Sequence, residues 1–460
     1  MTDSAVTTAA YTINPVAQVV APVFTPAGGT YTGTQSVTIG TTTAGATIRY
    51  TTDGSTPTST TGTVYSVAIS VASTSTLKAI AYAASMTDSA VTTAAYTIQA
   101  ANTGGPAWYN SAWSGRRSVT VDHTKVSNSS TLANFPMLFS VTDAAFKAAS
   151  SGGSVGKSDG TDILFTAADG VTKLSHELES YNPATGQLVA WVRLPALSNA
   201  SDTVVYVYFG NSSAADQQNK SGVWDNNFSG VWHMSDNASS QAVLDSTVNA
   251  GNGSAQNPTS RRSTAGQIGN ALVFDGSTDY VRIPNSPALD IPTNTPFTME
   301  TWVNVTAFPN PNQLFANLFG KGYYESNEAF FLRIQNNNGA LSLQAGEALQ
   351  GYSTITWPLS GWNTGEWHHV VGSWDGANWN LFLDGALKLR SPSANGPAKL
   401  GLPFTIGGEW LQGNTSGLMA ARIDEARVST IARSAGWIAT EFNNQQSPAT
   451  FYTVGPTQTQ

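Results

Sequence analysis

The chain has 460 residues, enough for about three domains of ordinary size, and it carries a net charge of −8 at pH 7. Only 11% of its residues are charged, and its lysines and arginines form no run longer than a pair. This pattern excludes the basic face through which proteins bind nucleic acid or an anionic membrane. The absence of cysteine excludes disulfides and thiolate chemistry, and no apolar run approaches the ~20 residues of a membrane-spanning helix.

The sequence MTDSAVTTAAYTI occurs at residues 1–13 and again, unchanged, at residues 86–98. An identity of this length does not arise by chance, so we expect the chain to begin within a repeated unit. Residues 1–14 are then the closing strand of a preceding repeat, and an export signal would lie upstream. A strand without its own sheet can also pair with a sheet edge of another subunit, which leaves self-association as an alternative.

Residues 15–98 are predicted to form one complete repeat. Apolar residues recur at every second position in SVTIG and TLKAIAYA, and turn signals such as Asp53-Gly54 separate the runs, as in an antiparallel sheet with one buried face. The segments TPAGGTYTGTQSVTI, ATIRYTTDGSTPT and TLKAIAYA resemble the Ig-like module at the C-terminus of chitobiase and β-hexosaminidase. The resemblance implies a stalk on a secreted bacterial protein, with no catalytic residues.

A linker of small residues, 99–107, is predicted to lead into a second sandwich at residues 108–228. In TVVYVYFGN both alternating sets of side chains, which begin at Val204 and Val205, are apolar, and this favours a central strand covered on both sides. The segments DILFT, ELESYNPATGQLVAWVRLP and VYFGN resemble an uncharacterised domain of bacterial and archaeal surface proteins that often precedes a LamG domain. The resemblance implies a location more than an activity.

Residues 229–455 are predicted to form a third sandwich with one short helix at Ala432–Phe442. FTMETWVNV alternates from Phe297 to Val305, and HHVVGSWDGANWNLFLDG is a predicted hairpin with Trp379 and Leu381 on one side. GNALVFDGSTDYVRIP, EWHHVVGSWDG and ARIDEARVS resemble the LamG/pentraxin-type concanavalin A-like jelly roll. The predicted fold class is therefore all-β, with three consecutive antiparallel β-sandwiches.

Known catalytic arrangements are missing from the sequence. HELES, at residues 176–180, lacks the second histidine of a zinc-protease motif, and His368 and His369 are expected to point to opposite faces of a strand as parts of the framework. Glycosidases need two carboxylates across the scissile bond. Glu177 and Glu179 are predicted to be solvated and without surrounding aromatic rings, and the adjacent Asp424 and Glu425 are expected to point to opposite faces. We therefore predict no enzyme activity.

A glycan-binding surface is predicted at one rim of the third sandwich. Aromatic rings stack on sugars while amide and carboxyl groups bind their hydroxyls. The resemblance to pentraxins places the ligand face on GKGYYESNEAFFLRI and FTIGGEWLQGNTSG, although the paired-calcium acidic run of pentraxins is not reproduced. Alternatively, the aromatic residues cover an exposed sheet edge. The candidate ligand-binding residues are Tyr323, Tyr324, Glu325, Asn327, Glu409, Trp410, Gln412 and Asn414.

A single structural calcium site is the second candidate. LamG-like sandwiches often carry one, and calcium takes six to eight oxygen ligands. LDSTVNAGNG is a glycine-rich loop that offers several oxygens, and the resemblance implies that the strand RIDEA lies beside it. Ordinary turn chemistry of Asp, Asn and Gly is the alternative. The candidate ligands are Asp245, Asn249, Asn252 and Asp424.

These features predict an extracellular or cell-surface protein that recognises or adheres to glycan without catalysis, with Ca²⁺ as a structural ion. A structural subunit of an extracellular filament or sheath, assembled through sandwich and strand contacts, is the first alternative. A polysaccharide hydrolase is the second.

Overall fold

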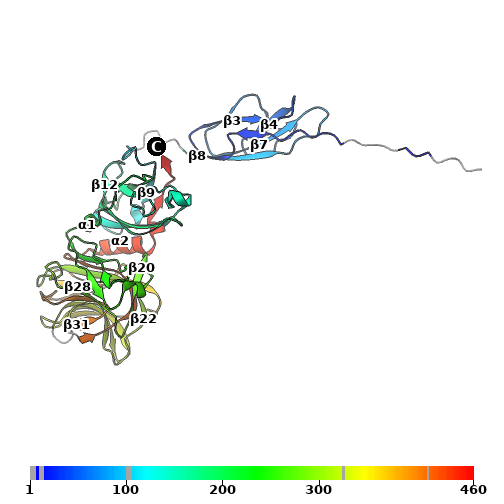
Figure 1. The fold of residues 1–460 in the computed structure, drawn as a ribbon. Helices are drawn as coiled ribbons and strands as arrows, with labels where there is room; N and C mark the ends of the chain where they lie inside the picture. Colours follow the sequence, from blue (N-terminus) through cyan, green and yellow to red (C-terminus); the bar gives the residue numbers. More distant parts are fainter. Residues whose placement is uncertain (1–6, 10–14, 100–105, 324–326, 412–413) are drawn as a thin grey trace, which may run out of the picture. The chain divides into compact units, whose positions relative to one another are not determined.

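The computed structural model describes residues 7–9, 15–99, 106–323, 327–411 and 414–460 (Figure 1). The chain is nearly all β, which confirms the predicted fold class. It divides into two compact units, residues 1–105 and 106–460, and the division falls within the predicted linker. No helix in the described ranges is both long enough and apolar enough to cross a membrane.

The N-terminal module consists of two sheets that enclose an apolar core. Val37, Leu77 and Ala79 are fully buried there, as their alternation with polar neighbours predicted. The segment repeated at residues 86–98 contributes the strand β8, which pairs with β7 and, in a parallel arrangement that differs from the antiparallel expectation, with β2. One sheet has the order β1 (Val23–Thr25), β3 (Gln35–Gly40), β6 (Ile69–Val71); the other has the order β2 (Gly29–Thr32), β8 (Thr92–Gln99), β7 (Ser75–Tyr82), β4 (Thr47–Thr51), β5 (Thr63–Val64).

The second sandwich begins the unit 106–460. Its central strand β15 buries Val205 and Val207 in the core and Tyr206 and Tyr208 against a smaller aromatic cluster, so both faces are covered as predicted. One sheet has the order β10 (Leu132–Thr142), β14 (Gln187–Leu197), β13 (His176–Asn182). The other has the order β12 (Lys173–Leu174), β11 (Leu164–Thr166), β15 (Thr203–Phe209), β9 (Gly115–Val121), β34 (Tyr452–Val454), and β35 (Gln458–Thr459) also pairs with β9.

The head is a sandwich of two eight-stranded sheets, whose inner faces form one core. Phe297, Met299, Trp379 and Leu381 lie in this core, as predicted. The first sheet runs β19 (Ser263–Ala265), β20 (Asn270–Asp275), β33 (Ala420–Ser429), β22 (Phe297–Ala307), β27 (Trp367–Trp374), β28 (Asn378–Leu383), β29 (Ala386–Pro392), with β16 (Phe228–Trp232) paired to β33. The second runs β17 (Ala242–Val243), β18 (Gly253–Ala255), β21 (Val281–Ile283), β30 (Phe404–Ile406), β23 (Phe315–Tyr323), β24 (Asn327–Asn337), β25 (Ala340–Glu347), β26 (Ser353–Pro358); β31 (Glu409–Leu411) and β32 (Asn414–Ser416) form a separate hairpin.

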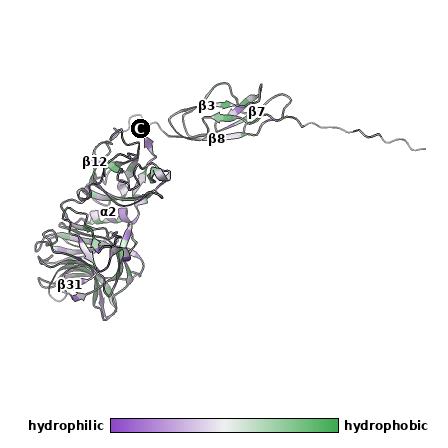
Figure 2. Ribbon diagram, in the orientation of Figure 1, coloured by the Kyte–Doolittle hydropathy of each residue, from purple (hydrophilic) through white to green (hydrophobic). Residues whose placement is uncertain are grey.

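Helix α2 (Ala435–Gln446) lies between the head and the second sandwich (Figure 1). The Ser434 side chain caps it by accepting the N–H of Trp437, so it begins three residues later than predicted and extends four residues further. Figure 2 colours this helix largely hydrophilic, yet Glu441 and Asn444 are buried. The remaining helical segments are short: η1 (His123–Lys125), η2 (Ala144–Phe146), η3 (Ala149–Ser151), α1 (Lys220–Val223), η4 (Thr259–Arg261) and α3 (Pro448–Phe451).

The chain returns from the head to the second sandwich at its C-terminal end. Strand β34 lies within residues 229–455, the predicted span of the head, but it pairs with β9. The predicted boundary is corrected accordingly. Phe451 and Tyr452 belong to the core of the second sandwich, and the same core includes Val371 and Phe382 from the head. Apolar packing therefore joins the two sandwiches directly.

A pH dependence of stability follows from His369, which is buried between Trp302 and Phe442. Burial lowers the pKa of its imidazole to about 3, from an ordinary value of 6.5. The unfolded chain therefore binds a proton here where the native chain does not, and the stabilisation, complete above pH 6.5, decreases as the pH falls. We expect a loss of about 3 kcal/mol at this site between pH 6.5 and pH 4. Urea unfolding should show a smaller pH dependence for His369→Gln than for wild type; equal slopes would contradict this prediction.

Candidate functional site

Strand β13 of the second sandwich places two glutamate side chains at the junction, the region where this sandwich packs against the head. Glu177 pairs opposite Trp191 of β14, and Glu179 is the extra residue where the register of this pair shifts between Leu178 and Ser180. Both side chains are almost fully buried, with 4% of Glu177 and 1% of Glu179 exposed. The prediction that they are solvated is wrong, because the head covers this face of β13.

A β-bulge in strand β33 of the head supplies two further carboxylates. Ala421 and Ile423 point into the core of the head, and so do Ala426 and Val428, so the alternation changes phase between them. Asp424 and Glu425 therefore both lie on the outer face, and Glu425 has a φ of 52°. The expectation that these adjacent residues point to opposite faces is wrong, since it assumed a strand without a bulge.

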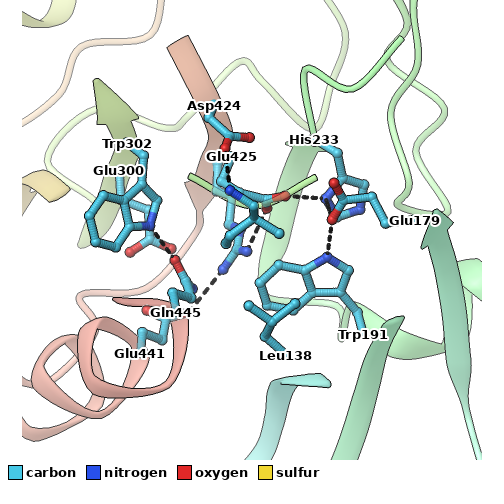
Figure 3. A network of polar contacts seen from close by, with 12 residues as sticks. Leu138, Glu179, Trp191, His233, Glu300, Trp302, Asp424, Glu425, Glu441 and Gln445 are labelled. Carbon is cyan, nitrogen blue, oxygen red and sulfur yellow. Dashed lines mark hydrogen bonds and ion pairs between the residues drawn. The ribbon is translucent and has the colours of Figure 1, made fainter. Parts of the chain in front are cut away.

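His233, which follows β16, lies among these carboxylates (Figure 3). Its Nε2 is 3.3 Å from Oε2 of Glu177, and its Nδ1 is 2.7 Å from Oε1 of Glu425. The same Nδ1 is 3.9 Å from Oε2 of Glu179. The imidazole thus connects two glutamates of the second sandwich with one glutamate of the head.

Two indoles fix the glutamates of β13. Trp224 Nε1 donates to Oε2 of Glu177 at 3.1 Å, and Trp191 Nε1 donates to Oε2 of Glu179 at 2.9 Å. The ring of Trp191 also stacks on His233, with centroids 5.8 Å apart and an interplanar angle of 20°. The prediction that Glu177 and Glu179 lack surrounding aromatic rings is therefore wrong.

Arg427 continues the network towards helix α2. Its guanidinium donates to Glu425 at 2.6 Å and to Glu441 at 3.2 Å. It also lies over the ring of Trp191, 4.4 Å from the centroid. Such a desolvated cation needs both carboxylates, because an unpaired charge in this environment is costly.

The environment separates the pKa values of the two glutamates on β13. Burial alone would raise the pKa of Glu177, but the charge of His233 and hydrogen bonds from His233, Ser246 and Trp224 lower it to about 2. Burial and the charge of Glu425 raise the pKa of Glu179 to about 8. At neutral pH the Glu177 side chain is a carboxylate and the Glu179 side chain is a carboxylic acid.

A pocket of about 680 Å³ opens above Glu177, Glu179 and His233. Most of its lining residues are polar, and the two sandwiches contribute to it about equally. The second sandwich and helix α1 provide Glu177, Leu178, Glu179, Gln218, Asn219, Lys220 and Ser221; the head provides His233, Ser235, Asp236, Leu244, Asp245, Ser246, Thr247, Ala250 and Asn252.

The predicted calcium ligands serve other purposes in the structure. Both carboxylate oxygens of Asp245 accept hydrogen bonds, from the N–H groups of Val231, Thr247 and Gly251 and from the Thr247 hydroxyl. Asn252 accepts the N–H of Asp245.

The other two predicted calcium ligands are also engaged. The Asn249 amide donates to two main-chain carbonyls, and Asp424 accepts the N–H of Ile268. The geometry gives no support to one ion bound by all four residues, and calcium stays a prediction.

The predicted glycan rim is described only in part, because Tyr324, Glu325 and Gln412 lie outside the described residues. The two predicted segments are adjacent, because Gly320 pairs with Thr405 where β23 meets β30. Glu409 is buried and accepts a hydrogen bond from Asn317, so its carboxylate does not face solvent. The ring of Trp410 packs against the guanidinium of Arg282, 4.1 Å from the ring centroid.

The other rim candidates pair within their own hairpins. Tyr323 lies opposite Asn327, and the exposed Asn414 lies opposite Leu411. The rim assignment stays a prediction.

Sequence reasoning missed His233, Trp191, Trp224 and Arg427. The glutamates of HELES were considered, but their connection to His233 depends on the packing of one sandwich against the other. The available signals were a strand with two glutamates and a tryptophan, Trp191, on the strand that follows it.

Three family models match successive parts of the chain. The model of the concanavalin A-like lectin/glucanases superfamily matches residues 275–439, that of the chitobiase/beta-hexosaminidase C-terminal domain matches residues 26–93, and that of a domain of unknown function, DUF2341, matches residues 159–265. The three matches confirm the predicted modules in their predicted order. The DUF2341 match includes residues from both walls of the pocket. Among curated proteins, none matches the chain.

Solved structures resemble part of the chain. Domain 4 of the extracellular arabinanase AbnA from Geobacillus stearothermophilus, in complex with arabinotriose, is 20% identical over 47% of this chain and 98% of that chain, with a TM-score of 0.35. The binding domain of botulinum neurotoxin serotype D is 14% identical over 48% of this chain, with a TM-score of 0.36. The match spans only 51% of that chain. Likeness at this level carries no information on function.

Proposed function

We propose that the chain is a non-catalytic recognition protein that binds a glycan in the pocket between the second sandwich and the head. The observation that supports this most is the pocket itself. Its volume of about 680 Å³ is suitable for a small ligand, and its wall offers amide, hydroxyl and carboxyl groups in the mixture that sugar hydroxyls require. The lectin-like family of the head agrees with a carbohydrate ligand.

Binding without hydrolysis is favoured by the way the two glutamates are held. Glycoside hydrolysis needs two carboxyl groups that both reach the scissile bond. Here Glu177 and Glu179 are nearly buried, each accepts an indole N–H, and His233 lies within 4 Å of both. The Oε2 atoms of the two glutamates could approach a sugar ring only by breaking these bonds.

We place the protein outside the cell or on its surface. The stalk-like Ig module and the lectin-like head are both typical of secreted carbohydrate-active proteins, and the cysteine-free composition is compatible with export. A filament or sheath subunit is the alternative, and ordered polymers under the electron microscope without any glycan retention would favour it.

Affinity electrophoresis against a panel of polysaccharides tests the proposal. We expect retention of wild type by at least one polysaccharide and at least a tenfold loss of affinity in Ser221→Trp, whose exposed side chain at the pocket wall would then fill the pocket. Trp410→Ala, on the predicted rim, is the matched control and should bind as wild type does. The reverse pattern would place binding on the rim, and release of reducing sugar would contradict a non-catalytic role.

A further inference from the structure

Three potential metal-ligating side chains meet beside the pocket, and two of them, Glu179 and His233, line it. Glu179, His233 and Glu425 each offer one ligand atom, and these three atoms lie within 4.8 Å of one another. In a tetrahedral site with bonds of about 2.0–2.2 Å, ligand atoms are about 3.3 Å apart. His233 Nδ1 is now 2.7 Å from Oε1 of Glu425 and 3.9 Å from Oε2 of Glu179, one distance below 3.3 Å and one above it. Shifts of these side chains by about half an ångström would therefore give the spacing of a zinc site.

Each of the three side chains is already held in place by a second partner. Nε2 of His233 faces Glu177, which is the carboxylate–histidine arrangement that orients an imidazole for metal binding. Trp191 donates to Glu179, and Arg427 donates to Glu425. Ligand orientation is therefore built into the fold, and none of these partners would have to move away.

The network around this group is rich in buried carboxyl groups. Six buried carboxyl groups share three cationic side chains, His233, Arg427 and Arg433. The carboxyl groups belong to Glu177, Glu179, Glu300, Asp424, Glu425 and Glu441. Coordination to a metal ion is one of the ways in which a protein compensates a buried carboxyl group.

Two observations other than the cluster point to a ligand. The side chains of Glu179 and Asp424 are both at least nine-tenths buried. Yet Oε1 of Glu179 and Oδ1 of Asp424 have no hydrogen-bond partner among the described residues. The pocket, which is lined by Glu179 and His233, gives an ion a path from solvent and room for water ligands. Buried oxygens of this kind normally have a partner.

We propose that Glu179, His233 and Glu425 bind one divalent transition-metal ion, of which zinc is the type, at the junction of the two sandwiches. An imidazole with two carboxylates suits zinc better than calcium, which prefers six to eight oxygens. The ion would tie the head to the second sandwich. Glycan binding does not require it, since the wall above the floor carries its own polar groups.

Isothermal titration of Zn²⁺ into chelator-treated protein at pH 7.5 tests the site. We expect one tightly bound ion per chain, and a loss of at least a hundredfold in affinity for His233→Gln. Glu177→Gln, which changes the partner of the imidazole but none of the three proposed ligands, should weaken binding about 10–100-fold. The matched control is His123→Asn, because His123 forms a second, more exposed group with Asp122 and Asp202, and this variant should bind as wild type does.

If a variant does not fold, the metal site can still be tested with the wild-type protein. Anomalous scattering at the zinc edge from crystals grown with Zn²⁺ should locate the ion between Glu179, His233 and Glu425. No binding by titration, or an ion found only beside His123, would overturn the proposal. If the protein retains glycan but does not bind Zn²⁺, the metal site is wrong and the proposed function is unaffected. If it binds Zn²⁺ but does not retain glycan, the proposed function is wrong and the metal site is unaffected.

Discussion

Replacing Arg427 by leucine is expected to destabilise the unit 106–460 by about 3–5 kcal/mol, because the change removes the buried guanidinium that pairs with both Glu425 and Glu441. The guanidinium also fills the space over Trp191, so leucine loses packing as well as charge. Urea unfolding followed by tryptophan fluorescence measures the loss.

Arg390→Leu is the matched control for this variant. Arg390 pairs with Asp375 at 2.9 Å, but its side chain is 57% exposed, and an exposed pair contributes less than about 1 kcal/mol. Equal losses in the two variants would show that the network around Arg427 contributes nothing beyond a surface ion pair. Unfolding in two separate transitions, with only the head affected, would show that the network does not join the sandwiches.

Removing residues 447–460 is expected to destabilise the second sandwich by more than about 6 kcal/mol, although this sandwich lies mostly before residue 228. The deletion removes Phe451 and Tyr452 from its core and leaves β9 without its partners β34 and β35. Loss of one large buried aromatic side chain alone costs about 3–5 kcal/mol. Circular dichroism and thermal unfolding measure whether residues 106–446 still fold cooperatively.

Tyr452→Phe is the milder companion to the deletion. The Tyr452 hydroxyl accepts the N–H of Ser140 at 2.7 Å and donates to its carbonyl at 3.0 Å, while the ring stacks on Phe139. Phenylalanine keeps the ring, so a loss of about 1–2 kcal/mol is expected. A truncated chain as stable as wild type would contradict the assignment of the C-terminal strands to the second sandwich.

Most of the fold could be predicted from the sequence because two-residue alternation reports directly on burial in a sheet. It identified the buried faces of β3, β7, β15 and β28 correctly. It could not show that β34 pairs with β9, since the partners are more than 300 residues apart and the short run Tyr452–Val454 is compatible with many sheets. The alternation pattern does not reveal a β-bulge either, and the bulge in β33 reversed the expected direction of the Glu425 side chain.

The candidate site was predicted less well for a related reason. Glu177 and Glu179 were noticed, but the side chains that bury them come from three different elements. Trp191 lies on the next strand, Trp224 follows helix α1, and His233 belongs to the head. Each of these residues has an ordinary structural interpretation when taken alone. Only the docking of the two sandwiches makes a pocket and a charged network of them.

The most direct test of glycan recognition at the junction is a crystal structure of the chain soaked with an oligosaccharide from the retained polysaccharide. We expect sugar rings in the pocket, with hydroxyl groups hydrogen-bonded to side chains such as Asn219, Asp236 and Asn252. Sugar bound beside Trp410 with the junction pocket holding only water would contradict the assignment.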